Sequence, residues 1–315
     1  MPAISVIIAT RNRAEPLRTT LATLRDQTLA PSEVLIVDSS DTAETRELIE
    51  NLLPETPFPL RYMSSKVRSA AVQRNMGAEA ASSEFLAFID DDVRLSGDFL
   101  MELARPFSED ADGRLAGVSG TIVNQIYTQP KGINRLLLAC CLGNFDDCWA
   151  GRLVGPAVNF LPQDITGRIQ TVDWLFSTGT AYRKCIFDKY RFGSQFRGYS
   201  FAEDVHLSAR IGRKYRLLNT TFARFEHMDM GHSTHTDWVA LGESMVTNRW
   251  AIMTEVLGMK RFRDLVRLFA YEVLYCTLAM LAQSRFRPGH LAQTGRLLWG
   301  KLRAFCGMRL RKSAA

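Results

Sequence analysis

The first hundred residues alternate short apolar runs with segments whose apolar residues recur at helical spacing. Four apolar runs predict strands, over residues 4–9, 33–37, 60–63 and 85–89. Strands separated by helices of this length form right-handed βαβ units with a parallel sheet. The sequence therefore predicts an α/β fold with a mostly parallel sheet flanked by helices.

Beyond this region the alternation continues with one interruption. We expect further helices over residues 99–107, 183–190 and 201–212, and further strands over residues 117–123, 174–182 and 216–221. Residues 124–170 scatter Gly, Pro and Asn, and only the apolar piece 133–142 predicts a helix there. We therefore expect these residues to form an insertion near the site.

The cysteines and the start of the chain indicate a cytoplasmic protein. The six Cys form no CxxC pair and show no regular spacing, which is typical of reduced thiols and not of a disulfide framework or a zinc site. No basic segment precedes an apolar stretch before the strand at Ile4, so no secretory signal is expected.

The positive charge is concentrated at the C-terminal end. Residues 260–315 contain twelve Lys or Arg and two acidic residues, a net charge of +10, so the remainder carries −4 of the total of +6. This distribution argues against a nucleic-acid enzyme with a basic cleft. We predict a catalytic domain over residues 1–255 and a helical, basic extension over residues 256–315.

The extension has the composition of helices that lie in a membrane interface. Bulky apolar residues stand among its basic residues, and an anionic lipid surface attracts such segments. Arg267 and Glu272 interrupt its apolar segment, residues 265–283, so that each uninterrupted apolar stretch is well short of the roughly 20 residues that a spanning helix needs. The alternative is a helical cap on the catalytic domain or on a second subunit of a homo-oligomer.

The apolar run 85–89 ends in Asp90, Asp91 and Asp92. Ligands of open α/β sheets bind at the carboxyl ends of strands, and three adjacent carboxylates repel one another unless a cation or a proton lies among them. Mg²⁺ or Mn²⁺, held by oxygens and bridging to phosphates, is the simplest such cation. The alternative is a solvated turn that caps the next helix.

Two other strand ends carry polar residues. Thr10 and Arg11 follow the first strand, where an Arg and the N-terminus of a helix can bind phosphate. Asp38 ends the second strand, where a carboxylate can accept a hydrogen bond from a base or a ribose hydroxyl. Asp41, with Glu44, forms a helix cap.

Two helix-associated motifs complete the set. Arg74 lies in a helix of small residues that can approach the sheet closely, and an Arg there neutralises diphosphate charge. Glu203 and Asp204 stand at an expected helix start, where carboxylates also occur simply as caps. Beside a metal site, however, such a carboxylate could accept a proton from an attacking hydroxyl.

Taken in order, these segments resemble the inverting GT-A glycosyltransferases of family 2, from Ile4 to about Trp250. The segments that carry the resemblance are Ser5–Asn12, Val37–Asp41, Gln73–Gly77, Asp90–Asp92, and Gly179–Asp204 ending in the Glu-Asp pair. The resemblance implies that Asp38 contacts the base or ribose, that Arg74 supports the nucleotide, and that Thr10, Arg11 and Asp91 lie at the donor.

The resemblance also implies a metal site and a catalytic base. Asp90 and Asp92 would be the DxD carboxylates, with Asp92 as the metal ligand, and His227 fits the place of a metal-binding His, with His232 and His235 as rivals. Asp204 would be the base, and Glu203 would assist acceptor binding.

The expected activity is that of an inverting hexosyltransferase. Val246 stands where processive members of the family carry Gln, although Arg249 and Trp250 match them, so we expect transfer of a single sugar. The donor would be a UDP- or dTDP-sugar with Mn²⁺ or Mg²⁺, and the acceptor a hydroxyl of a glycan or lipid-linked glycan. The enzyme would lie at the inner face of the plasma membrane and bind no nucleic acid.

Two other classes stay open. One is a non-catalytic sugar-nucleotide-binding or scaffold subunit, against which the retained Asp90, Asp92 and Asp204 argue. The other is a sugar nucleotidyltransferase, which would want a Gly-rich loop after the first strand; residues 9–13 contain no Gly.

Overall fold

The computed structural model of the chain describes residues 2–196, 201–228, 237–284 and 288–312. Contacts divide the chain into two compact units, Met1–Tyr127 with Leu161–Met230, and Thr128–Phe160 with Gly231–Ala315. The contacts therefore group residues 128–160 with the C-terminal helices, because α5 packs on them. The predicted domain boundary at residue 255 stays a prediction.

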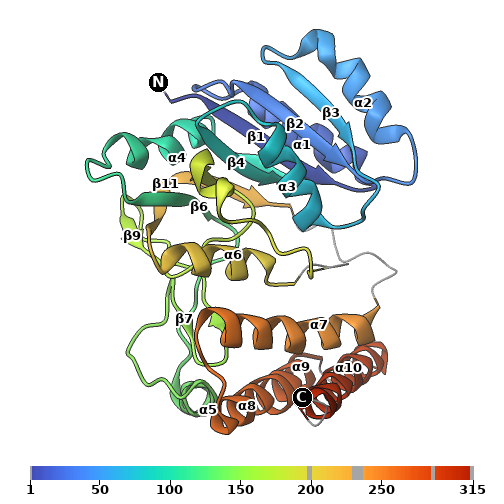
Figure 1. Cartoon of the computed structure of the whole chain (residues 1–315), viewed down its shortest axis with the longest axis vertical. Coiled ribbons are helices and arrows are strands. Elements are labelled where there is room, and N and C mark those ends of the chain that lie inside the picture. Colours follow the sequence, from blue (N-terminus) through green and yellow to red (C-terminus); the bar gives the residue numbers. More distant parts are fainter. Residues whose placement is uncertain (1, 197–200, 229–236, 285–287, 313–315) are drawn as a thin grey trace. The chain divides into compact units, whose positions relative to one another are not determined.

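The first unit is built around a curled sheet of mixed α/β type (Figure 1). The path of the sheet is β3-β2-β1-β4-β10-β6-β11-β5, and β9 pairs with β11. Its strands are β1 (Ile4–Thr10), β2 (Glu33–Asp38), β3 (Leu60–Ser64), β4 (Phe85–Asp90), β5 (Val93–Leu95), β6 (Leu115–Ile122), β9 (Ile169–Thr171), β10 (Thr180–Arg183) and β11 (Arg216–His227). Pairing among β1 to β4 is parallel, and so is that of β6 with β11, which confirms the expected α/β fold with a mostly parallel sheet.

Helices cover the sheet of this unit as the sequence predicts. They are α1 (Ala14–Arg25), α2 (Glu44–Leu52), α3 (Ala70–Ala80), α4 (Phe99–Ser108) and α6 (Glu203–Gly212), with short 3₁₀ turns η1 (Leu53–Glu55) and η2 (Lys184–Asp188). Side chains of α3 and α6 share one buried core with strand residues such as Phe88. A Cβ at Gly77 would collide with Ile7, so the glycine lets α3 lie close to β1.

Two expectations for residues 174–190 are wrong in their extent. The strand expected over 174–182 forms only at Thr180–Arg183, and it runs antiparallel between β4 and β6. The preceding apolar residues are buried as a loop, because the backbone N–H of Leu175 donates to the Ser208 side chain instead of to a strand. The helix expected over 183–190 is a single 3₁₀ turn.

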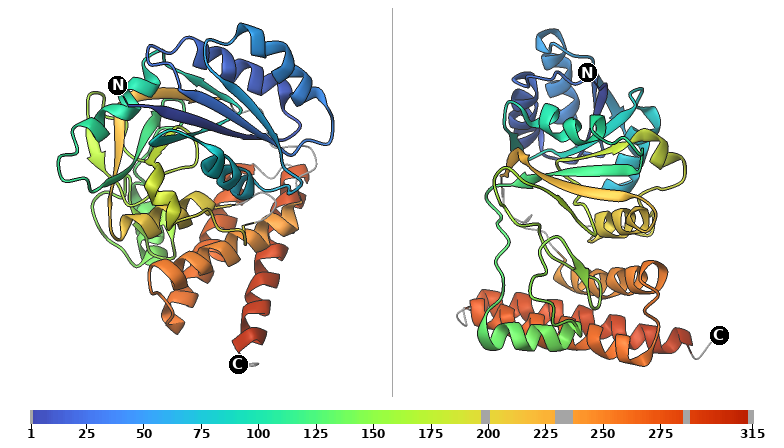
Figure 2. Two further views of the ribbon diagram at one scale, coloured as in Figure 1. Left: turned by 45° about the horizontal axis from the view of Figure 1, so that its top comes forward. Right: turned by 90° about the vertical axis from the view of Figure 1, so that its left-hand side faces the viewer.

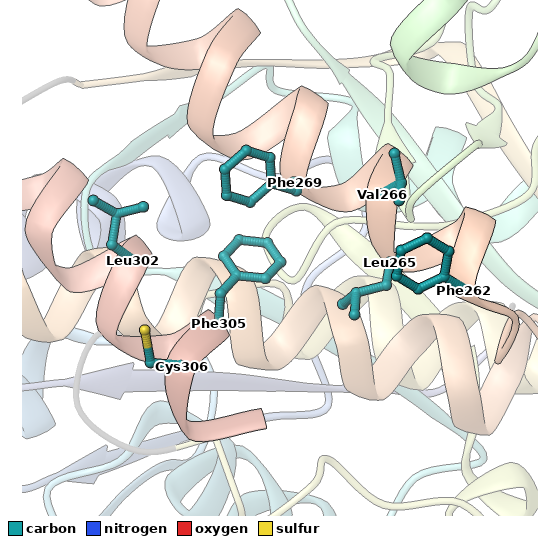
Figure 3. Close-up of a pocket in the computed structure, with 7 residues that line it drawn as sticks. All are labelled: Phe262, Leu265, Val266, Phe269, Leu302, Phe305 and Cys306. Atoms are coloured by element: carbon teal, nitrogen blue, oxygen red, sulfur yellow. The ribbon is translucent and has the colours of Figure 1, made fainter. Parts of the chain in front are cut away.

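The second unit is helical (Figures 1 and 2). Its elements are α5 (Gly132–Leu142), the hairpin β7 (Leu153–Val154) and β8 (Val158–Asn159), α7 (Trp238–Ala251), η3 (Ile252–Val256), α8 (Phe262–Phe269), η4 (Ala270–Tyr275), α9 (Cys276–Ser284) and α10 (Pro288–Lys312). A Cβ at Gly242 or Gly300 would strike backbone of the facing helix, so these two glycines let α7 and α10 pack side by side. The rings of Phe269 and Phe305 join α8 to α10 at 5.2 Å (Figure 3).

A buried charge network lies inside this unit. Glu272 is fully buried and pairs with two cations: Arg249 Nε lies 2.7 Å from its Oε1, and Lys301 Nζ lies 2.6 Å from its Oε2. Arg249 also donates to the carbonyl oxygen of Ala157 and lies over the Tyr271 ring at 5.3 Å. Although burial opposes it, the two cations hold the pKa of Glu272 below its usual value, so the carboxylate stays charged in the interior. Within the described ranges, none of the helices combines the length and the apolar character that crossing a lipid bilayer requires.

Candidate functional site

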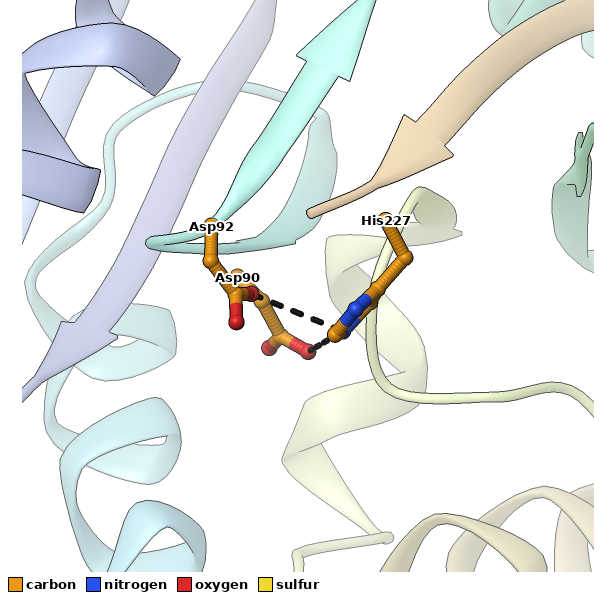
Figure 4. A group of neighbouring side chains, drawn as sticks. All are labelled: Asp90, Asp92 and His227. Carbon is orange, nitrogen blue, oxygen red and sulfur yellow. Dashed lines mark ion pairs between the residues drawn. The ribbon is translucent and has the colours of Figure 1, made fainter. Parts of the chain in front are cut away.

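Three predicted ligand side chains meet at the carboxyl ends of β4 and β11 (Figure 4). His227 Nε2 lies 3.5 Å from Asp92 Oδ1 and 4.0 Å from Asp90 Oδ2, and ligand atoms of the three residues lie within 4.8 Å of one another. The main chain at these positions is fixed, because Asn124 exchanges two hydrogen bonds with the main chain of His227 and Met228 N donates to Asp92 O. The structure thus brings together residues that lie 135 positions apart in the chain.

Each of the two carboxylates has its second oxygen held by an arginine. Arg74 Nη2 lies 2.9 Å from Asp90 Oδ1, and Arg13 donates to Asp92 Oδ2. The arginines therefore leave Asp90 Oδ2 and Asp92 Oδ1 turned toward His227. Charged hydrogen bonds of this kind orient a carboxylate strongly.

The chemistry of this donor set fits a hard divalent cation. Burial, opposed by His227 and reinforced by the neighbouring Asp90 carboxylate, raises the pKa of Asp92. A cation between the two carboxylates would remove that repulsion. His227 Nδ1 is buried and has no hydrogen-bond partner among the residues that the structure describes, so that edge of the imidazole is held by no donor or acceptor there. The two carboxylate oxygens suit Mn²⁺ or Mg²⁺, whereas an imidazole suits Mn²⁺ less well than oxygen does; three protein ligands leave coordination positions for phosphate oxygens.

Asp91 faces the first strand and not the metal-ligand cluster. Its Oδ2 accepts a 2.6 Å hydrogen bond from Thr10 Oγ1, and its Oδ1 lies 3.0 Å from Arg13 Nε. Burial, only partly offset by Arg13 and Thr10, raises the pKa of Asp91 to about 7. Both Thr10 and Asp91 line a cavity of about 260 Å³, where they stand close to the arginines of the loop after β1.

Three arginines line that cavity, Arg11, Arg13 and Arg68. Arg11 and Arg68 both pair with Asp41, which also accepts from the Asn12 amide at 3.0 Å. The predicted cap role of Asp41 is therefore wrong: α2 begins at Glu44 with Ala43 as its N-cap, and the Asp41 carboxylate instead binds the loop after β1 and the segment before α3. The cavity is rich in guanidinium groups, which suits a phosphorylated ligand.

Asp38 is satisfied inside the protein. Its Oδ1 accepts from the Ser40 backbone N–H at 2.8 Å, and its Oδ2 accepts from the Tyr62 hydroxyl at 3.0 Å. It is buried and is absent from the residues that line the arginine-rich cavity. A ligand contact to Asp38 would therefore replace or share one of these hydrogen bonds.

Glu203 and Asp204 begin α6, as expected, but they face different partners. Glu203 is buried and pairs with Arg74, so Arg74 bridges Asp90 and Glu203. Asp204 accepts backbone N–H donors from Val205 at 2.7 Å and Ser177 at 3.2 Å. Burial raises the pKa of Asp204, opposed by those two donors and by Arg74. A raised pKa makes a carboxylate a better proton acceptor.

The turn before this pair has an unusual backbone. Ala202 has φ of 62°, a left-handed conformation that costs a residue with a Cβ free energy and that tends to persist at functional sites. The turn places Glu203 against Arg74 and leaves Asp204 at the first turn of the helix, partly exposed.

Some site residues were not predicted from the sequence. Arg13, in the loop after β1, is one of them, and nothing in the sequence pattern indicates that it pairs with Asp91 and Asp92. Asn124 falls in a segment expected to be an insertion. The rival ligands His232 and His235 lie outside the described residues.

Known sequences resemble the chain in the region of this site. Residues 5–136 match the model of the family described as Glycosyl transferase family 2. The succinoglycan biosynthesis protein ExoM of Rhizobium meliloti (strain 1021) is 36% identical over 90 residues, 29% of this chain and 29% of its own length. The putative glycosyltransferase EpsH of Bacillus subtilis (strain 168) is 30% identical over 211 residues, 66% of this chain and 55% of its own length. The chain thus spans between 29% and 55% of these relatives.

A solved structure is similar over nearly the whole chain. It is that of the mannosyltransferase PcManGT from Pyrobaculum calidifontis in complex with GDP-Man and Mn²⁺, at a TM-score of 0.60 and 16% sequence identity, covering 96% of this chain and 87% of that one. At this identity the likeness concerns the fold. The match at residues 5–136 shows that this part of the chain resembles the family 2 glycosyltransferases, and the solved structure shows that the fold is of the GT-A type.

Proposed function

We propose that the protein is a metal-dependent, inverting glycosyltransferase that moves one hexose from a nucleoside-diphosphate sugar to a hydroxyl of a glycan or lipid-linked glycan. The observation that carries the proposal is the convergence of Asp90, Asp92 and His227. Both carboxylates lie inside the segment that matches family 2. The names of the relatives, a succinoglycan biosynthesis protein and a putative glycosyltransferase, support a glycan acceptor.

The proposed metal site consists of Asp90 Oδ2, Asp92 Oδ1 and the His227 imidazole. A bound Mn²⁺ or Mg²⁺ would supply charge stabilisation for the departing diphosphate. The residues around it fix the ligands: Arg74 and Arg13 hold the second oxygens of the two carboxylates. Arg13, about one third exposed and lining the arginine-rich cavity, can also donate to a donor phosphate there.

Asp204 is the proposed catalytic base. Its raised pKa suits it to take the proton of the acceptor hydroxyl while that oxygen attacks the anomeric carbon. A single displacement from the face opposite the diphosphate inverts the configuration. Glu203 is buried against Arg74, so we assign it the positioning of Arg74 and Asp90 alongside the assistance to the acceptor that the resemblance implies.

The donor is bound in the cavity at the carboxyl ends of β1 and β4. Thr10, Arg11 and Asp91 line it, together with Arg13 and Arg68. A UDP- or dTDP-sugar is the proposed donor, with the base directed toward Asp38 and its hydrogen-bonded Tyr62.

The proposal is tested by incubating the full-length protein with UDP-, dTDP- and GDP-sugars and measuring release of nucleoside diphosphate with Mn²⁺ and with EDTA. We expect metal-dependent release with one class of donor, and an Asp204→Asn variant that keeps Mn²⁺-dependent donor affinity while turnover falls roughly 10²–10⁴-fold. A variant with undiminished turnover would remove Asp204 from this role. Donor binding without any hydrolysis or transfer would instead indicate a non-catalytic binding subunit.

We also propose that the protein acts peripherally at the cytoplasmic face of the plasma membrane. The net charge of +10 over residues 260–315 supports attraction to anionic lipids. The test is cosedimentation with vesicles that contain 30% phosphatidylglycerol or none. Binding that does not depend on the anionic lipid, or that survives 1 M NaCl unchanged, would contradict this part of the proposal.

A further inference from the structure

An open apolar groove lies between α8 and α10 in the helical unit (Figure 3). Seven side chains line it, four from α8 and three from α10: Phe262, Leu265, Val266, Phe269, Leu302, Phe305 and Cys306. Its volume is about 360 Å³, within the range of pockets that hold small molecules. None of the lining side chains carries a charge, so the groove offers an occupant only apolar contacts.

The groove leaves large apolar side chains in water. Phe262 is 77% exposed, and Val266 and Phe269 are also exposed beside it. The same unit contains ten of the fifteen exposed large apolar side chains of the described residues, Trp299 of α10 among them. Contiguous exposed apolar surface of this kind marks a surface that another molecule covers.

The charges around the groove select the chemistry of that molecule. Among the side chains described between residues 260 and 308, every exposed charged one is cationic: Lys260, Arg261, Arg263, Arg296 and Arg303. Both acidic residues of this stretch are buried. Asp264 accepts from the Arg261 backbone N–H at 2.9 Å, and Glu272 is held by Arg249 and Lys301. No exposed carboxylate within this described stretch therefore opposes an anion. Two of the arginines already have acidic partners, Arg303 with Glu243 of α7 at 3.0 Å and Arg263 with the buried Asp264 at 3.6 Å.

We propose that the groove binds one hydrocarbon chain of a phosphate-bearing membrane lipid, with the phosphate held by the exposed arginines that flank Phe262. Arg261 and Arg263 are the neighbours of Phe262 in the chain, and both are exposed at the start of α8. The chain occupies the uncharged groove and the headgroup stays among the guanidinium groups. The inference deepens the membrane part of the proposed function, because a lipid-linked acceptor has this chemistry.

A second copy of the chain fits the same face poorly. A symmetric pair would place the arginines beside one groove opposite those beside the other, and the described stretch 260–308 offers no exposed carboxylate to pair with them. An anionic lipid meets both requirements of the surface, the apolar lining and the cationic surroundings.

The test uses decyl phosphate, below its micellar concentration, titrated calorimetrically into the full-length protein. We expect saturable binding that weakens about tenfold when octyl phosphate replaces it, as the loss of two buried methylene groups predicts. Binding should weaken about fivefold in an Arg263→Gln variant, since one cation near an anionic headgroup contributes about this factor. Absence of saturable binding, or equal affinity for both chain lengths, would overturn the proposal.

A matched pair of cysteine variants locates the site. Cys306 is exposed and lines the groove, whereas Cys140 is exposed on α5 and lies outside its lining. Cys306→Trp should fill the groove and abolish decyl phosphate binding, while Cys140→Trp should leave it unchanged; equal loss in both would overturn the assignment. A dimer seen by sedimentation that dissociates only in Cys306→Trp would assign the groove to a second copy instead.

These measurements are made without nucleotide or metal. Their failure would therefore leave the glycosyltransferase proposal standing, and the donor assays above would fail independently if the catalytic assignment were wrong. The folded state of each variant is checked by its thermal midpoint, which should stay within 3 °C of the parent chain, about 1 kcal/mol for a protein of this size.

Discussion

Arg74 offers the sharpest test of how the site is held together. Its guanidinium is buried and bridges two acids, Glu203 in the interior and Asp90 at the edge of the cluster, where the carboxylate is 26% exposed. The change Arg74→Gln keeps a polar side chain, although a shorter one, and removes the cation. Two carboxylates then lose their partner.

The magnitude follows from the burial of each pair. Breaking a buried ion pair costs about 3–5 kcal/mol because one charge stays behind unpaired, and Glu203 is in this situation. The partly exposed Asp90 adds about 1 kcal/mol or less, since water screens it. We therefore expect the free energy of unfolding of this unit to fall by about 3–5 kcal/mol, which lowers the thermal midpoint by about 6–20 °C.

The loss of stability in Arg74→Gln should depend on pH. Because Glu203 is buried, desolvation in Arg74→Gln disfavours its charged form, so the cost in folding free energy should grow as pH rises and shrink as the carboxylate protonates. The assay is urea unfolding at pH 7 and pH 5. Arg18→Gln, the same change at an exposed pair with Glu15, serves as the control and should cost less than about 0.5 kcal/mol. A loss below 1 kcal/mol at pH 7, or one equal at both pH values, would refute the reasoning.

Four further substitutions probe other parts of the molecule. Although burial opposes them, hydrogen bonds lower the pKa of Glu33 to about 2, so the ionised Glu33 stabilises the fold above its usual pKa and this stabilisation is lost as pH falls toward 2. Glu33→Gln should lower the free energy of unfolding at pH 7 by about 2–3 kcal/mol and make that free energy fall less steeply in acid. A variant whose pH profile of stability runs parallel to that of the parent chain would contradict this. Gly77→Val should lower the free energy of unfolding by about 1–3 kcal/mol or more, because the new side chain would displace Ile7. Urea unfolding measures this loss, and an unchanged midpoint would mean that α3 can shift away from β1 at no cost. Glu272→Gln leaves two buried cations and should cost about 3–5 kcal/mol, whereas Lys301→Met, which leaves a neutral pair, should cost less; the reverse order by calorimetry would refute the account.

The parallel part of the sheet was predictable because its signals are local. The apolar runs of β1, β2 and β4 are continuous, as strands buried on both faces require, and the helical spacing of the segments between the strands predicts the alternation. The Asp triplet was also visible, since a strand end in such a sheet faces the ligand. The antiparallel insertion of β10 between β4 and β6 was not, because pairing direction leaves no mark on a four-residue strand.

The contacts of the site between residues far apart in the chain could not be predicted from the sequence. Arg74 and Glu203 lie 129 residues apart, and no spacing rule links them. The pattern indicated Arg74 as a nucleotide contact, whereas its side chain is buried between two carboxylates. Similarly, Asp38 is hydrogen-bonded to Tyr62 from a neighbouring strand, a contact that depends on strand order and register.

The buried arginine of α7 has a practical consequence for protein engineering. Arg249 and Trp250 match two letters of the motif of polymer-forming relatives, and Val246 stands where those carry Gln. Yet the guanidinium is already committed to Glu272 and to the Ala157 carbonyl, and Val246 is buried. Introducing Gln at position 246 would therefore bury an amide without releasing the arginine toward any sugar. A redesign for the addition of many sugars would first have to remove the buried ion pair between Arg249 and Glu272 and replace the residues that bind Arg249 with apolar residues of matching volume.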